Sequence, residues 1–263
     1  MKVCLLLAAC LASPLLAEES RITALVQQGD AADARHDSQA ALLALQQAEQ
    51  IDGRNFGVLL RISKQYADLS GECKDSAVAK LLAEKALDYG RRAAALDDKN
   101  AKAHLNLAIC YGKLTDFAGN KTKVDYARII RDEAERSLVL DPADDYAWHV
   151  LARWHVEVAN LNGVLKVLAN LVYSGLPPAS NEDAVRCFRK ASELAPQRVM
   201  HHAELAKLYT RMAKSDSAAQ EWQNVVGLKS DGAQDEQYQR EAKIALEQFR
   251  KQGAAGNRGV AHR

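Results

Sequence analysis

The chain has 263 residues, of which 48% are hydrophobic and only 6% aromatic, with 35 basic against 34 acidic side chains. This composition provides enough apolar surface for a packed core, and the scarcity of aromatic residues favours helix over sheet. The balanced charge gives no electrostatic reason to expect nucleic acid or an anionic membrane surface as the main partner.

Residues 1–17 have the pattern of a secretory signal peptide. Lys2 precedes an apolar run over residues 3–16, which ends at Ala17 before two acidic residues. Such a run is too short to span a membrane comfortably, since a span needs roughly 20 apolar residues. We therefore expect cleavage after Ala17 and an exported, periplasmic or extracytoplasmic protein. Two alternatives stay open, a lipid modification at Cys10 and a retained N-terminal membrane anchor.

A helical repeat dominates residues 18–252. Trp148, Leu151, Ala152 and His155 lie at i, i+3, i+4 and i+7, so they share one face of a helix. The large residue fills a groove, and the small one lets a second helix approach, which is typical of a tetratricopeptide (TPR) repeat. The same spacing begins at four other large residues: Leu25, Leu59, His104 and His202.

The second helix of each repeat shows a matching pattern of small and large residues. In the first and fifth repeats it begins 16 positions after the large reference residue, and in the middle three after 27, 26 and 36 positions. The middle repeats therefore carry about 11, 10 and 20 extra residues between their helices, and such insertions often project on the binding side. The second-helix positions are Ala41/Leu45/Ala48, Ala86/Gly90/Ala93, Ile130/Ala134/Ser137, Ala184/Phe188/Ala191 and Ala218/Trp222/Val225.

The last predicted element is an amphipathic helix that caps the array, and residues 253–263 are expected to form a disordered tail. We therefore predict an all-α, right-handed α-solenoid of about five TPR-like helical hairpins, with insertions in the middle three and a C-terminal capping helix. The apolar stripe of the capping helix consists of Tyr238, Ala242, Ala245, Leu246 and Phe249.

Several stretches go beyond a generic repeat, including AICY at 108–111, DFAGNKTKV at 116–124, LARW at 151–154, LPP at 176–178 and FRKA at 188–191. With them the chain resembles the regulator of microtubule dynamics family over roughly residues 20–252. The resemblance implies a helical-repeat adaptor without catalytic apparatus, and animal members are associated with microtubules and organelle membranes. An exported protein would not meet microtubules, so a microtubule-associated role is expected only if the N-terminus is not an export signal.

No P-loop, HExxH, nucleophile elbow or dinucleotide fingerprint occurs in the sequence, so we expect neither an enzyme nor a cofactor. The histidines do not suggest a metal site. His149 and His155 are about 240° apart around a helix and share no face. His104, His155 and His202 occupy positions where the repeat needs a large flat side chain, so we interpret them as packing residues.

Three residues outside the packing pattern are candidates for a binding groove: Arg153, Trp154 and Asn160. Arginine can hold a carboxylate or phosphate with two hydrogen bonds, and tryptophan supplies area for stacking. The alternative is a structural arginine that is paired with Asp145 or Glu157.

The insertion of the fourth repeat is apolar on nearly every side between residues 164 and 173, with Leu165, Leu168 and Tyr173 as candidate contacts. A helix of this kind is normally buried, and here it either plugs the solenoid or lines an apolar channel. We therefore expect a non-catalytic scaffold that binds a protein or peptide partner in its concave groove. The alternative is a carrier of a lipid or apolar ligand that associates with a membrane without spanning it.

Overall fold

The computed structural model describes residues 14–167 and 177–260, and all regular structure within them is α-helical. The helices belong to two compact units, residues 1–96 and 97–263. The prediction of an all-α solenoid of TPR-like repeats is confirmed.

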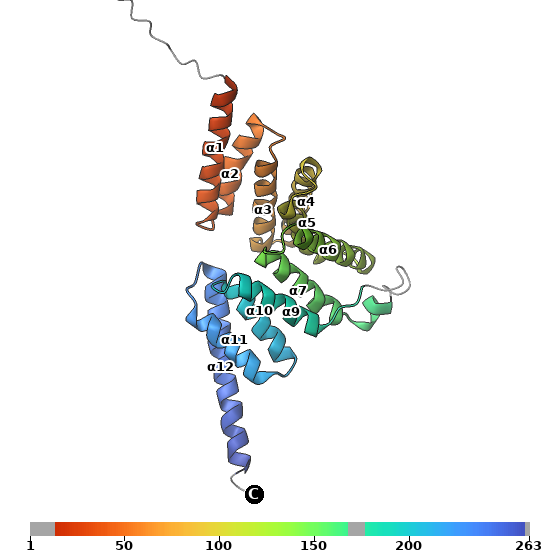
Figure 1. Ribbon diagram of the computed structural model, residues 1–263, viewed down its shortest axis with the longest axis vertical. Coiled ribbons are helices and arrows are strands. Elements are labelled where there is room, and N and C mark those ends of the chain that lie inside the picture. The colour runs from red at the N-terminus through yellow and green to blue at the C-terminus, as the bar shows by residue number, and fades with distance from the viewer. Residues whose placement is uncertain (1–13, 168–176, 261–263) are drawn as a thin grey trace, which may run out of the picture. The chain divides into compact units, whose positions relative to one another are not determined.

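Unit 1 contains the first two repeats, each an antiparallel pair of helices (Figure 1). The pairs are α1 (Pro14–Asp33) with α2 (Ser38–Ile51), and α3 (Phe56–Glu72) with α4 (Ser76–Leu96).

Unit 2 contains the other three repeats and a further helix, α12, which packs against α10 and α11 as the capping helix was expected to do. Its helices pair as α5 with α6, α7 with α9, and α10 with α11. Their bounds are α5 (Ala101–Thr115), α6 (Asn120–Leu140), α7 (Asp145–Ala159), α9 (Asn181–Leu194), α10 (Val199–Arg211), α11 (Ser215–Gly227) and α12 (Ala233–Val260).

Side-chain caps determine where several first helices begin. Asn55, Asn100 and Asp144 precede α3, α5 and α7, and their side-chain oxygens accept hydrogen bonds from backbone N–H groups of the first turn. Each such cap satisfies an amide that has no partner within the helix, and it stabilises the helix by about 1 kcal/mol.

Small residues let the paired helices approach. Ala152 and Ala206, the small positions of the fourth and fifth repeats, are completely buried. In the first repeat the small residue is Gly29, where an added Cβ would lie 2.9 Å from Leu45 Cγ on α2. The predicted packing pattern therefore places its small residues at the contacts between helices.

The large reference residue has a polar function as well as a packing one in the three repeats of unit 2. In each of these repeats a ring nitrogen contacts the backbone carbonyl six residues earlier, so the ring ties the first helix to the turn before it. The contacts are His104 Nε2 to Asp98 O at 2.7 Å, Trp148 Nε1 to Pro142 O at 2.9 Å, and His202 Nε2 to Pro196 O at 3.0 Å.

The two histidines at this position also reach the second helix of their repeat. His104 Nδ1 lies 2.6 Å from Glu133 Oε2, and His202 Nδ1 lies 2.7 Å from Glu221 Oε2. The hydrogen bond to Glu221 raises the pKa of His202 despite its burial, since both of its acceptors favour the charged ring. Interpreting these histidines only as packing residues was therefore incomplete.

The extra residues of repeats two and three lie within helices, not between them as the sequence analysis expected. They lengthen the hairpins, because α4 and α6 have 21 residues each whereas α2 has 14 and α11 has 13. The connections are short, at residues 73–75 and 116–119. The Ala, Leu, Lys and Glu residues that fill α4 favour helix propagation over a loop. In the fourth repeat the insertion lies between α7 and α9, with residues 168–176 outside the described part.

The outer boundaries of the predicted domain stay predictions. Helix α1 begins at Pro14 and runs through Ala17, the expected cleavage position. Helix α12 continues to Val260 rather than ending before Gly253, so the expected tail is helical over most of its length.

Replacing two helical glycines by alanine tests the close approach of α1 and α2. Alanine favours a helix by about 1 kcal/mol over glycine, and Gly112 on α5 has nothing within 4 Å of an added Cβ. We expect Gly112→Ala to raise the free energy of unfolding by about 0.5–1 kcal/mol. Gly29→Ala should lower it by about 1 kcal/mol, because the Cβ overpacks against Leu45. Urea denaturation followed by circular dichroism measures both, and equal stabilisation by the two changes would contradict the close approach.

Candidate functional site

Arg153 on α7 is the candidate that the structure leaves available to a ligand. Its side chain is exposed, and it forms no hydrogen bond or ion pair with any residue that the structure describes. Asp145, one of the two acids expected to pair with it, instead contacts Arg198 Nε at 3.0 Å and His201 Nε2 at 2.7 Å. The guanidinium of Arg153 is therefore free to meet a carboxylate.

A charged cluster between α10 and α12 lies within electrostatic range of Arg153. Lys207 Nζ contacts Glu204 Oε1 at 3.3 Å and Glu241 Oε2 at 3.0 Å, and it lies 4.6 Å from the centre of the Tyr238 ring. Burial raises the pKa of Tyr238 to about 12, with Glu204 adding to the rise and the positive charge of Arg153 opposing it. In this cluster Lys207 is paired with two carboxylates, whereas Arg153 forms no hydrogen bond or ion pair in the described part of the chain.

Trp154 belongs to the core and not to a groove. It is 4% exposed, and its Nε1 donates a hydrogen bond to Ala127 O on α6 at 2.6 Å. Its ring meets His155 edge to face, with centroids 5.0 Å apart. The expectation of a ligand contact is wrong. Trp154 lies outside the pattern that packs within its own repeat, but its face of α7 packs against α6, the second helix of the preceding repeat.

Asn160 ends α7 and holds the start of α9. Its Nδ2 donates to Val156 O at 2.6 Å and to Asn181 Oδ1 at 3.0 Å. These bonds satisfy a helix terminus, so the amide group has a structural role.

The inserted segment is described only in part. Leu165 is half-buried, while Val164 and Val167 are 66% and 58% exposed. Leu168 and Tyr173 lie outside the described residues. The apolar channel and the lipid cargo that it would serve stay predictions.

Two buried histidines and a partly exposed aspartate, which we call the histidine chain, join α7 to α10. It consists of Asp145, His201 and His149: His201 Nε2 lies 2.7 Å from Asp145 Oδ2, and the two Nδ1 atoms lie 2.9 Å apart. The sequence analysis did not find it, because His149 and His201 are 52 residues apart and form no local motif. The spacing of the repeats could have indicated it: His149 directly follows Trp148, the large reference residue of the fourth repeat, and His201 directly precedes His202, that of the fifth.

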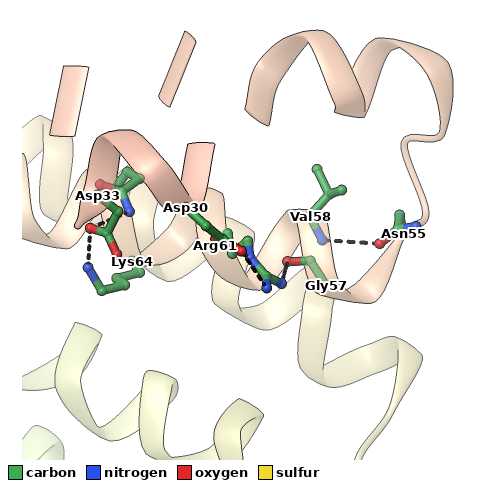
Figure 2. A network of polar contacts seen from close by, with 8 residues as sticks. Asp30, Asp33, Asn55, Gly57, Val58, Arg61 and Lys64 are labelled. Atoms are coloured by element: carbon green, nitrogen blue, oxygen red, sulfur yellow. Dashed lines mark hydrogen bonds and ion pairs between the residues drawn. The ribbon is translucent and has the colours of Figure 1, made fainter. Parts of the chain in front are cut away.

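In unit 1, ion pairs join the first helices of the two repeats (Figure 2). Arg61 on α3 holds both carboxylate oxygens of Asp30 on α1, at 2.7 and 3.1 Å, and Lys64 contacts Asp33 at 2.6 Å. Burial opposes ionisation of Asp33, but hydrogen bonds from Lys64 and Gln65 hold its pKa below the ordinary value. These half-exposed pairs contribute at most about 1 kcal/mol each, and their charges are already matched.

Within the described residues no cluster of His, Cys, Asp or Glu is placed to hold a metal ion. Over the same part of the chain, no helix combines the length and apolar character needed to cross a membrane.

Comparison with known proteins gives a consistent family. The model of the family "Regulator of microtubule dynamics protein 1-3" matches residues 25–250. Regulator of microtubule dynamics protein 1 of Mus musculus is 29% identical over 201 residues, which cover 76% of this chain and 65% of the mouse protein. Protein 3 of Xenopus laevis is 27% identical, with 61% of this chain and 35% of the frog protein covered. The chain thus spans less than two thirds of the length of these relatives.

Two solved structures show the same fold. A thermophilic TPR protein of Thermus thermophilus has a TM-score of 0.64 at 15% identity, and the match covers 86% of this chain and 98% of that protein. PilF of Pseudomonas aeruginosa has a TM-score of 0.55 at 14% identity, with 90% and 91% covered.

The relatives correct the expected location. The expectation of an exported, periplasmic or extracytoplasmic protein is wrong, because the matched proteins come from animals and are named for microtubule dynamics. Microtubules are structures of the cell interior. The apolar pattern of residues 3–16 was therefore not a sufficient basis for inferring export.

Substitutions at two neighbouring positions separate core from surface. We expect Trp154→Ala to lower the free energy of unfolding by about 3–5 kcal/mol, because it leaves a cavity and removes a buried hydrogen bond. Arg153→Gln should change it by less than about 0.5 kcal/mol, since the side chain is exposed and has no partner among the described residues. Chemical denaturation of both variants measures the difference, and a comparable loss for Arg153→Gln would mean that Arg153 is also structural.

Proposed function

Because the chain belongs to the regulator of microtubule dynamics family and folds as a solenoid of TPR-like repeats, we propose that it is a non-catalytic scaffold that binds a protein segment on the first helices of unit 2. The relatives support a scaffold of this family, and the exposed guanidinium of Arg153 on α7 supports the place of binding.

The chemistry of Arg153 suggests which segment it holds. A guanidinium presents N–H donors in a planar fork that matches the two oxygens of a carboxylate, and such charge-assisted pairs are stronger than neutral hydrogen bonds. A bound segment should therefore place an acidic side chain or a chain-terminal carboxylate against Arg153.

The surroundings fit binding better than catalysis. Lys207 on α10 contacts Glu204 on the same helix and Glu241 on α12, and the two imidazoles of the histidine chain are buried. A general acid or base must reach its substrate, whereas these groups join helices.

A peptide-binding measurement tests the proposal. The probe is a fluorescent acidic peptide with a free C-terminus, compared with a peptide in which Gln and a C-terminal amide remove the carboxylates. We expect Arg153→Gln to weaken binding of the acidic peptide by roughly 10- to 100-fold, because a hydrogen bond to a charged group contributes about 1.5–3 kcal/mol. Fluorescence anisotropy gives the affinities.

Two further variants sharpen this experiment. Arg153→Lys keeps the charge but not the fork, so its affinity should fall between those of the wild type and Arg153→Gln. Arg211→Gln removes an exposed arginine from the end of α10 and is the matched control, with unchanged affinity expected. Equal binding of the two peptides, or an equal loss in Arg153→Gln and Arg211→Gln, would contradict the assignment.

The printed names of the relatives favour a second candidate, a direct microtubule-associated role. The purified chain should then sediment with polymerised tubulin and stay in the supernatant with unpolymerised tubulin. A chain that stays in the supernatant in both cases has no direct affinity for the polymer, which would leave the scaffold role without this partner.

A further inference from the structure

The acceptor positions in the histidine chain determine where its hydrogens lie. The carboxylate of Asp145 only accepts, so His201 Nε2 carries a hydrogen. In a neutral His201 ring Nδ1 then has the lone pair, and the facing Nδ1 of His149 must donate. Both contacts form at once when each ring is neutral and in one particular tautomer.

The surroundings keep the pair neutral. Burial, together with the charges of His201, Arg153 and Arg198, holds the pKa of His149 well below 6.5. Burial also lowers the pKa of His201, and Arg198 and His202 act in the same direction, while Asp145 opposes them. From α9 the uncharged ring of Phe188 meets His149 at a centroid distance of 5.2 Å.

Protons change this contact in two steps. The pair can hold one extra proton and keep both contacts in two ways: on Nε2 of His149, whose Nδ1 still donates, or on His201 if His149 moves its own hydrogen to Nε2. A second proton leaves two N–H groups facing each other at the present separation of 2.9 Å. Two donors without an acceptor repel, so full protonation is incompatible with the contact.

We propose that the histidine chain is a proton-sensitive junction, which holds α7 against α10 when both rings are neutral and releases them from each other on acidification. The junction lies one helical turn from Arg153, since His149 and Arg153 are four residues apart on α7. Acidification would therefore alter the surface to which we assign partner binding, although the junction itself does not depend on that assignment.

The sign of the effect on stability follows from the lowered pKa values. An unfolded chain takes up protons at both histidines as pH falls through 6.5, whereas the folded chain does not, so acid favours unfolding. His202 acts in the opposite sense: its pKa is raised by Glu221, and its contribution is complete below pH 6.5 and lost at higher pH. Loss of stability below pH 6.5 therefore does not come from His202.

Thermal unfolding of a matched variant tests the junction. In the double variant His149→Phe/His201→Phe the rings are kept for packing against Tyr146 and Phe188, and Asp145 keeps its contact with Arg198. His155, whose pKa burial also lowers, is present in both proteins, so its effect cancels.

Between pH 7 and pH 5.5 we expect the melting temperature of the wild type to fall by about 5 °C more than that of the double variant. His36→Asn, outside the junction, should follow the wild type. Equal falls in the wild type and the double variant would overturn the proposal.

Nitrogen NMR of the imidazoles in the wild type gives a readout that needs no variant to fold. At pH 7.5 we expect His149 with its hydrogen on Nδ1 and His201 with its hydrogen on Nε2, and neither ring should become charged until the pH is below 6.5. A charged ring at pH 7.5, or the opposite tautomers, would overturn the junction. Because neither measurement involves a peptide, failure of the junction is distinct from failure of the proposed carboxylate site.

Discussion

The close approach of two helices at a small residue is the constraint on which every hairpin of this chain depends. Ala152 and Ala206 are fully buried, and Gly29 leaves no room for a Cβ beside Leu45. Because protein interiors are packed as densely as organic crystals, a larger side chain at these positions must move a helix. The large residue in the same pattern then meets the neighbouring turn, where the rings of His104, Trp148 and His202 reach backbone carbonyls.

Polar contacts determine which charges remain available for a partner. In unit 1, Arg61 and Lys64 of α3 are matched by acids on α1 (Figure 2). In unit 2, Asp145 is held by Arg198 and His201. Arg153 differs from them because no described acid reaches it. The histidines also differ in their partners: His202 lies against two acceptors, whereas one hydrogen lies between the facing Nδ1 atoms of His149 and His201. Burial and partners therefore give one residue type two opposite responses to pH.

Much of the fold was predictable because the repeat is encoded locally. The i, i+3, i+4, i+7 spacing identified all five hairpins, and the stripe from Tyr238 to Phe249 identified the helix that packs on α10 and α11.

The candidate binding site was less predictable than the fold. Trp154 lies outside the pattern that packs within its own repeat, yet it is buried against the preceding one. The extra residues of repeats two and three lengthened helices instead of separating them, because spacing alone does not distinguish a longer helix from a longer loop. The expected export was wrong for a similar reason, since an apolar run does not specify a destination.

The helices, their pairing into repeats and the family could all be inferred from the sequence, since each depends on residues within a few helical turns or on short continuous stretches. Which charged side chains have a partner and which do not depends on how the repeats pack against one another. Asp145 could have paired with Arg153, eight residues away, but Arg198 and His201 from another repeat reach it instead. His149 meets His201 across 52 residues for the same reason. Contacts between first helices of successive repeats depend on how the hairpins pack, and no local spacing in the chain records that geometry.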